Sequence, residues 1–259
     1  MPIALSQKQR IHYRIEGDRG PFLLLYPPFL EGLLCWYRAK YIERLQDYYR
    51  LILLDPVGHG RSDYSLALEH YTLESRAQHV LDIMEELKVE KFHFLGMGMG
   101  AQVGFFMAAH FPSRLRSLVT AGAHPYAITT EMQKFQEWIQ QLRSDEISVF
   151  LESFKTQELV SPEREAEILK GSPEAYALSL EAISQWKGIG QDLNSISIPG
   201  LLITATGEEK FLSIREAGRK MPRARYLILP ELRYNDGLLE AELVVPELMD
   251  FIRKLRRSE

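Results

Sequence analysis

The 259-residue sequence contains a single cysteine, Cys35, which excludes a disulfide within the chain and a zinc site built from several thiolates. Cys35 stands between Leu34 and Trp36, so we expect a small buried apolar side chain rather than a reactive thiol. The seven histidines show none of the spacings that are typical of zinc motifs, and we therefore expect no metal site.

Long apolar segments and clustered basic residues are also scarce. No stretch approaches the ~20 consecutive apolar residues that cross a membrane, and the first ten residues lack the apolar run of a signal peptide. The formal net charge is −4, and no basic stripe indicates binding to nucleic acid. The sequence therefore predicts a cytoplasmic protein that binds neither membrane nor nucleic acid.

The first half of the chain alternates short apolar runs with amphipathic stretches. Strands are predicted where the runs are short and continuously apolar, at residues 22–26, 51–54, 92–95 and 115–121. Helices are predicted at residues 72–87, with Thr72 as the N-cap, and at residues 100–111. Strand–helix–strand alternation of this kind predicts a parallel sheet that is covered on both faces.

The pattern changes after Pro125, and from residue 126 to about residue 191 it indicates about four helices and no strand. Ser161 and Ser172 each precede a proline, which is typical of a helix start. Strands at 200–206 and 225–229 and helices at 212–220 and 244–255 then follow. We expect a sheet domain formed by residues 1–125 and 192–259, with a helical lid at residues 126–191.

Residues 94–101 read FLGMGMGA and predict a strand that turns sharply into a helix. Gly96, Gly98 and Ala101 fit the loose spacing of a dinucleotide-binding turn. The following strand nevertheless ends in Thr120-Ala121-Gly122, without the acidic residue that would bind a ribose. We therefore expect no nucleotide and no other cofactor.

This layout, together with LDPVGHGRSD at residues 54–63, resembles the α/β-hydrolase superfamily, specifically its small lidded esterase, epoxide-hydrolase and carbon–carbon hydrolase branch. YTLES at 71–75 and HFPSRL at 110–115 are also similar. The resemblance covers nearly the whole chain. It implies an α/β fold, with a mostly parallel twisted sheet flanked by helices and an inserted helical lid, and it implies a structural role for His59.

The resemblance also shows which catalytic groups are replaced. Where the superfamily has a nucleophilic serine, an acid and a histidine, this chain has Gly98, Lys210 and Tyr234. No histidine follows His124, so a shift of register does not restore the base. A carboxylate from Glu208 or Glu209 remains an open alternative for the acid.

The superfamily's oxyanion hole uses two backbone N–H groups. By position, the first belongs to Met99 and is retained, whereas the second falls on Pro28, which has no N–H. These replacements argue against ordinary serine-type ester hydrolysis.

The polar groups that the resemblance directs toward the pocket are Tyr26, His124, Lys210 and Tyr234, with Phe29, Gly98 and Met99 beside them. We expect a non-hydrolytic enzyme of the proton-transfer, cyclisation, isomerisation or lyase type, with Tyr234 and Lys210 as its catalytic pair and a small molecule as its substrate. The alternatives are a non-catalytic binder of a ligand, a protein partner or a second copy of the chain, and a hydrolase with a rerouted site.

Overall fold

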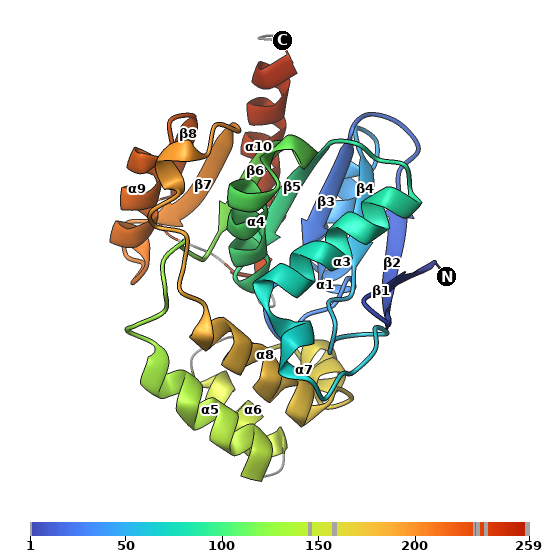
Figure 1. Cartoon of the computed structure of the whole chain (residues 1–259), viewed down its shortest axis with the longest axis vertical. Helices are drawn as coiled ribbons and strands as arrows, with labels where there is room; N and C mark the ends of the chain where they lie inside the picture. Colours follow the sequence, from blue (N-terminus) through green and yellow to red (C-terminus); the bar gives the residue numbers. More distant parts are fainter. Residues whose placement is uncertain are drawn as a thin grey trace.

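The computed structural model describes residues 2–144, 147–156, 160–229, 231, 234–235 and 238–256, with only the backbone at 234–235 and 238–239. Its centre is an eight-stranded sheet in the order β1-β2-β4-β3-β5-β6-β7-β8 (Figure 1). The pairs β1–β2 and β2–β4 are antiparallel. All the other neighbouring pairs of this sheet, from β4–β3 to β7–β8, are parallel. Their bounds are β1 (Ile3–Ser6), β2 (Gln9–Glu16), β3 (Phe22–Tyr26), β4 (Arg50–Leu54), β5 (Phe92–Met97), β6 (Leu115–Ala121), β7 (Gly200–Ala205) and β8 (Ala224–Leu229).

Helices cover both faces of the sheet, as the apolar runs predict. Leu24 and Ile52 pack on one face with α3 (Leu73–Glu86), α4 (Met99–His110) and α9 (Phe211–Lys220). Their neighbours Leu23 and Leu51 pack on the other face with α1 (Cys35–Arg38), α2 (Tyr41–Leu45) and α10 (Ala241–Arg256). Because successive side chains point to opposite faces, strands covered on both sides are apolar at every position. Cys35 is buried in this second core, as expected.

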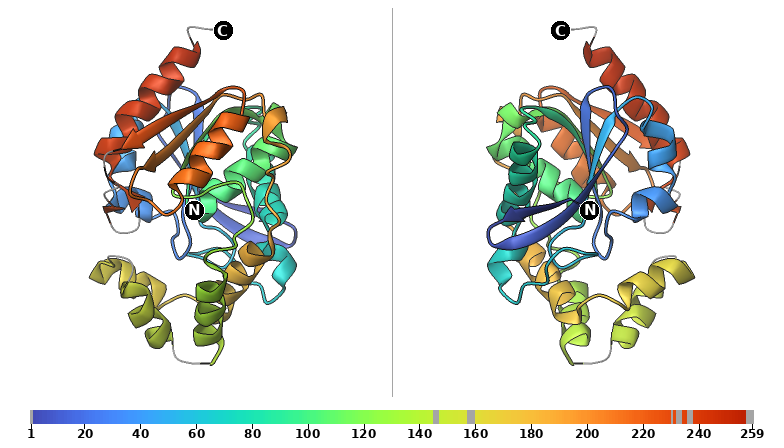
Figure 2. Two further views of the ribbon diagram at one scale, coloured as in Figure 1. Left: turned by 90° about the vertical axis from the view of Figure 1, so that its left-hand side faces the viewer. Right: turned by 90° about the vertical axis from the view of Figure 1, so that its right-hand side faces the viewer.

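Four helices, α5 (Met132–Ser144), α6 (Ile147–Lys155), α7 (Pro162–Ile168) and α8 (Pro173–Gln185), lie between β6 and β7 in the chain and below the carboxyl ends of the parallel strands in Figures 1 and 2. The hydroxyls of Ser161 and Ser172 accept the N–H groups of Arg164 and Ala175, so both predicted caps are confirmed. Trp138, Phe150 and Phe154 belong to a separate core among these helices. None of the helices in the described ranges is long and apolar enough to cross a membrane.

The other described elements are short. They are the single-turn helices η1 (Leu68–Tyr71), η2 (Pro112–Arg114) and η3 (Leu193–Ser195) and the hairpin of β9 (Tyr234–Asn235) and β10 (Leu238–Leu239). The strands β1 and β2, which the sequence analysis did not predict, pair with each other in an antiparallel register. The strand β1 has only four residues, alternately exposed and buried, and β2 mixes charged with apolar residues, so neither gives a continuous buried apolar run. The strand β1 lies at the sheet edge, where short strands are common.

His59 holds the loop that follows β3. Its Nδ1 lies 3.1 Å from the carbonyl oxygen of Val57, and its Nε2 accepts the N–H of Leu30 at 3.3 Å. Burial, and then the positive charge of Arg76, lower the pKa of His59 to about 3, so the ring is neutral at pH 7. Both ring nitrogens are used by the backbone, which agrees with the structural role expected for this residue.

A buried ion-pair network joins the inserted helices to the sheet domain. Glu31, which follows β3, lies 2.5 Å from Nε of Arg164 on α7 and 2.5 Å from a guanidinium nitrogen of Arg38 on α1. The side chains of Glu31 and Arg164 are 1% and 2% exposed. Water hardly reaches either charge, so it screens their attraction only weakly. Separating α7 from the core would leave a buried charge without its partner.

Replacing Glu31 with glutamine removes the carboxylate between the two guanidinium groups. We expect Glu31→Gln to lower the free energy of unfolding by about 3–5 kcal/mol in urea denaturation, because a buried charge loses its counter-ion. Glu167, 36% exposed and also paired with Arg38, is the matched control. Glu167→Gln should cost no more than about 1 kcal/mol, and equal losses for the two variants would contradict this account.

Candidate functional site

A cavity of about 760 Å³ separates the carboxyl ends of the strands from the inserted helices. Its walls come from the β3, β5, β6 and β7 ends of the sheet, from the first turn of α4, and from α5, α6, α7 and α8. The floor carries Met97 and Met99, and the inserted helices contribute the apolar side chains Phe135, Trp138 and Ile183. The volume is typical of a small-molecule site.

The predicted sharp turn lies at the centre of this floor. The strand β5 ends at Met97, Gly98 has φ 52° and ψ −118°, and α4 begins at Met99. The Gly98 N–H donates to the carbonyl oxygen of Ala121 at 2.9 Å. Positive φ favours glycine. The turn therefore places the amino end of α4, with its free N–H groups and positive dipole end, at the cavity.

The loop after β3 forms the opposing wall with Pro28 and Phe29. A Cβ atom on Gly98 would lie 3.1 Å from Cβ of Pro28, so the two backbones approach closely. Phe29 makes edge-on contacts with His59 and Tyr176, with 6.1 Å between ring centres in each case. Phe29, Gly98 and Met99 thus line the cavity, whereas Pro28 offers no N–H on this side.

Tyr26 does not line the cavity, in contrast to the expectation from the resemblance. It is the last residue of β3 and is fully buried, with its ring stacked on Phe94 at 6.2 Å. Strand alternation places it with Leu24 on the sheet face that α3 and α4 cover. Burial raises the pKa of Tyr26, and the nearby Arg76 partly opposes this effect. Tyr26 therefore belongs to the core.

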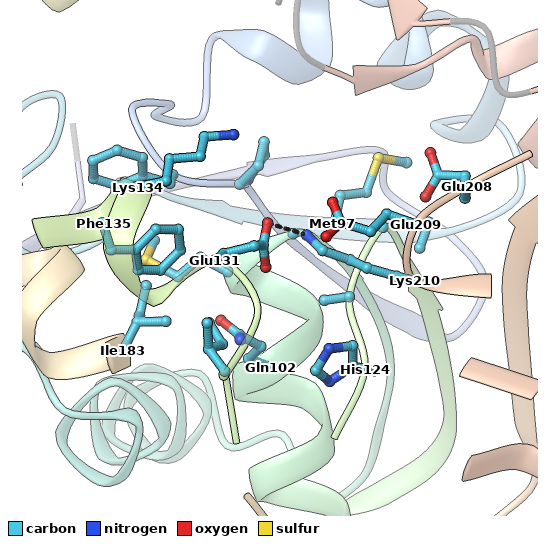
Figure 3. A pocket seen from close by; sticks show the side chains of 18 of the residues that line it. Met97, Gln102, His124, Glu131, Lys134, Phe135, Ile183, Glu208, Glu209 and Lys210 are labelled. Carbon is cyan, nitrogen blue, oxygen red and sulfur yellow. Dashed lines mark ion pairs between the residues drawn. The ribbon is translucent and has the colours of Figure 1, made fainter. Parts of the chain in front are cut away.

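Lys210 reaches the cavity from the N-cap of α9 and pairs with a carboxylate of the inserted segment (Figure 3). Its Nζ lies 3.3 Å from Oε1 of Glu131, which immediately precedes α5. The two side chains are 29% and 15% exposed, so water only partly screens the pair. This contact joins the sheet domain to the inserted helices at the cavity itself.

His124, just past the end of β6, lies beside this pair (Figure 3). Burial lowers the pKa of His124, the charge of Lys210 lowers it further, and Glu131 opposes both effects. Its Nδ1 accepts the N–H of Tyr126 at 3.3 Å, which leaves Nε2 to carry the proton of the neutral ring. His124, Lys210 and Glu131 are thus electrostatically coupled in one part of the cavity.

The second predicted catalytic residue, Tyr234, lies in β9, whose backbone pairs with β10. Its side chain is outside the described residues, so the Tyr234–Lys210 pair stays a prediction. Glu208 and Glu209 both line the cavity, Glu208 partly buried and Glu209 exposed. Their use as a shifted acid likewise stays a prediction.

The sequence analysis missed several polar cavity residues. Glu131 is among them, as are Gln102 on α4, Lys134 on α5 and Arg164 on α7. Three of them occupy ordinary helical positions and Glu131 immediately precedes α5, and only the docking of the helices brings the four together. Among the described residues, no group of three histidine, cysteine, aspartate or glutamate side chains is arranged to hold a metal ion.

Comparison with known proteins identifies the family. A family model described as "alpha/beta hydrolase fold" matches residues 21–209. Among curated proteins, 3-oxoadipate enol-lactonase 2 of Acinetobacter baylyi is 28% identical over 208 residues, which is 76% of each chain. The dihydrolipoyllysine-residue acetyltransferase component of the acetoin cleaving system of Pseudomonas putida is 26% identical over 93% of this chain and 66% of its own length.

Solved structures agree with this fold. The enol-lactonase from Burkholderia xenovorans LB400 has a TM-score of 0.83 at 21% identity, over 97% of this chain and all of that chain. The chain therefore belongs to the α/β-hydrolase fold family.

The coupling among the three cavity groups makes the pKa of His124 a test of the site. We expect Lys210→Met to raise this pKa, because it removes a positive charge, and Glu131→Gln to lower it, because it removes a negative one. Titration of the imidazole signals by NMR measures both shifts. Lys8→Met, in the exposed turn between β1 and β2, serves as the control and should leave the pKa unchanged. Shifts of the same sign in both cavity variants would show that the groups are not coupled as described.

Proposed function

We propose that this protein is a non-hydrolytic enzyme that moves protons on a small oxo acid without forming a covalent acyl-enzyme. The observation that carries the proposal is the grouping of Glu131, Lys210 and His124 at a cavity whose floor is the amino end of α4. A carboxylate, an ammonium and an imidazole are the usual groups of general acid–base catalysis.

The absence of a nucleophile at the sharp turn between β5 and α4, which we call the elbow, supports a non-hydrolytic reaction. Gly98 has no side chain, and the described residues that line the cavity include no serine, threonine, cysteine or tyrosine. In the proposal, Gly98, Lys210 and Tyr234 replace the Ser-Asp-His groups, and hydrolysis through an acyl-enzyme is lost with them.

The proposed reaction uses the groups that remain. A substrate carbonyl oxygen accepts a hydrogen bond from the Met99 N–H, where the α4 dipole favours developing negative charge. Glu131 removes a proton from the adjacent carbon, the C–H electrons form the carbon–carbon double bond of an enolate, and Lys210 and His124 donate hydrogen bonds to stabilise it. Return of the proton to the opposite face of that carbon gives an isomer of the substrate, so no atom is gained or lost.

We assign Lys134 as the cation that binds the carboxylate of an acidic substrate. The Lys134 ammonium lies 4.4 Å from the centre of the Trp138 ring, so its chain is held along the cavity wall. One relative is named for an enol-lactone of 3-oxoadipate, a dicarboxylate with a ketone. An oxo acid would therefore meet both the acid–base groups and a cation for its carboxylate.

A non-catalytic binder is the alternative that a specific observation favours. Pro28 stands where a second N–H donor would be needed, so the described wall stabilises an oxyanion with fewer hydrogen bonds than a hydrolase provides. In that case the cavity would hold a ligand without changing it. Glu208 and Glu209 keep open a hydrolase with a rerouted site.

Hydrogen–deuterium exchange at carbon separates these possibilities. With 3-oxoadipate in D₂O, we expect the protein to accelerate exchange at the carbons flanking the ketone, followed by NMR. Glu131→Gln and Lys210→Met should reduce the accelerated rate by roughly 10²–10⁴-fold, as loss of a general acid or base does, while Lys8→Met should keep it. Saturable binding of the ketone without exchange would replace the enzyme proposal with the binder.

Restoring a serine at the elbow should not restore a hydrolase. We expect Gly98→Ser to show no burst of p-nitrophenol from p-nitrophenyl acetate and no acylated protein by mass spectrometry, because Lys210 and Tyr234 stand where the resemblance places the acid and the histidine that would activate a serine. The variant should also be destabilised by about 1–3 kcal/mol, since a side chain enters a positive-φ position 3.1 Å from Pro28. Accumulation of an acyl-enzyme would instead show that a base and acid survive nearby.

A further inference from the structure

A second hollow lies at the other end of the molecule, where the parallel strands begin. Its volume is about 650 Å³. It is bordered by the starts of β5 and β6, by the segments that lead into β7 and β8, and by the end of α10. In Figure 1 this end of α10 points away from the helices α5 to α8, so the hollow is separate from the cavity described above.

Four exposed cations from four different elements border this hollow: Lys91, Arg116, Arg223 and Arg256. No aspartate or glutamate is among the residues that line it. Within the described ranges, none of the four contacts a carboxylate, and the contact that Arg223 makes is with the carbonyl oxygen of Ser197 at 3.4 Å. This concentration of positive charge is unusual in a chain whose 35 acidic residues outnumber its 31 lysines and arginines.

Several cations elsewhere on the surface have acidic partners. Arg10 pairs with Asp63 at 2.9 Å, and Arg143 pairs with both Glu174 and Glu181 at 3.1 and 2.8 Å. The dipole of α10 accounts for Arg256, since cations suit the carboxyl end of a helix. It does not account for Arg116 and Arg223, which come from strand starts. Their shared hollow thus gathers positive charge without a carboxylate among the residues that line it.

His93 forms part of the same hollow. It is 4% exposed, and its Nδ1 lies 2.8 Å from the hydroxyl of Ser117. Burial, followed by the charges of Arg116 and Arg256, lowers the pKa of His93 to about 4. Both cations are thus close enough to affect one buried ring that lines the hollow, so their positive charges act in the same place.

We propose that this hollow, which we call the basal groove, is a binding site for a small molecule that carries several linked phosphate groups. Guanidinium groups match phosphate oxygens in planar, two-point hydrogen bonds. A single phosphate group carries about two negative charges against the four cations of the hollow, whereas a linked series carries more. The prolines Pro21, Pro112 and Pro199 give the groove apolar edges for the organic part of such a ligand. The site does not depend on the proposed reaction.

The test uses inorganic tripolyphosphate as the probe and isothermal titration calorimetry at fixed ionic strength. We expect saturable binding to the full chain, weakened at least tenfold in the double variant Arg116→Gln, Arg223→Gln. The matched control removes the same charge from exposed positions on α9, as Arg215→Gln, Arg219→Gln, and should bind as the unchanged protein does. Equal weakening of both double variants, or no binding to the unchanged protein, would overturn the proposal.

His93 gives the test a local signal that a general loss of charge does not produce. Bound phosphate groups should raise the pKa of His93 from about 4, because negative charge nearby favours the imidazolium. NMR titration with tripolyphosphate should show this shift in the unchanged protein and not in the Arg116→Gln, Arg223→Gln variant. Equal shifts with sulfate at the same ionic strength would indicate an adventitious ion only. Binding to phosphatidic acid vesicles without binding to tripolyphosphate would overturn the proposal in favour of a lipid surface.

Discussion

The close backbone contact between the first turn of α4 and the end of β3 is the constraint on which the rest of the site depends. A Cβ atom on Gly100 would lie 2.3 Å from the carbonyl oxygen of Tyr26, and one on Gly96 would lie 2.3 Å from the carbonyl oxygen of Gly100. These distances exclude any side chain. The glycines therefore bring the positive end of a helix to the middle of the sheet edge, and the cavity forms around it.

Two of the ion pairs that connect the inserted helices to the sheet domain differ in physical character. The Glu31–Arg164 pair is buried and little affected by salt, whereas the Glu131–Lys210 pair is partly exposed and screened by dissolved ions. The first holds α7 in place. The second lies among the groups that the proposed reaction uses. The charges that would transfer a proton therefore also help to set the distance between the sheet domain and the inserted helices.

Much of the fold could be predicted from the sequence, because strands covered on both faces are continuously apolar and serine–proline pairs mark helix starts. The edge strand β1 and its neighbour β2 carry neither signal. The side on which Tyr26 lies depends on strand register, which the resemblance alone did not provide. Glu131 could not be predicted as a site residue, since its importance arises only when α5 docks opposite Lys210. Composition alone could not reveal a basal groove whose cations come from distant segments.

Pro28 of the cavity wall follows another proline, Pro27, and this pair has a consequence for how the cavity adapts to its contents. Consecutive prolines have few conformations even in the unfolded chain, so ordering this loop costs little entropy on folding or on binding. The loop that faces Gly98 across the cavity is therefore rigid. The cavity would adjust to a larger or smaller ligand through movement of α5 to α8. Its selectivity for ligand size therefore depends on how easily those helices move.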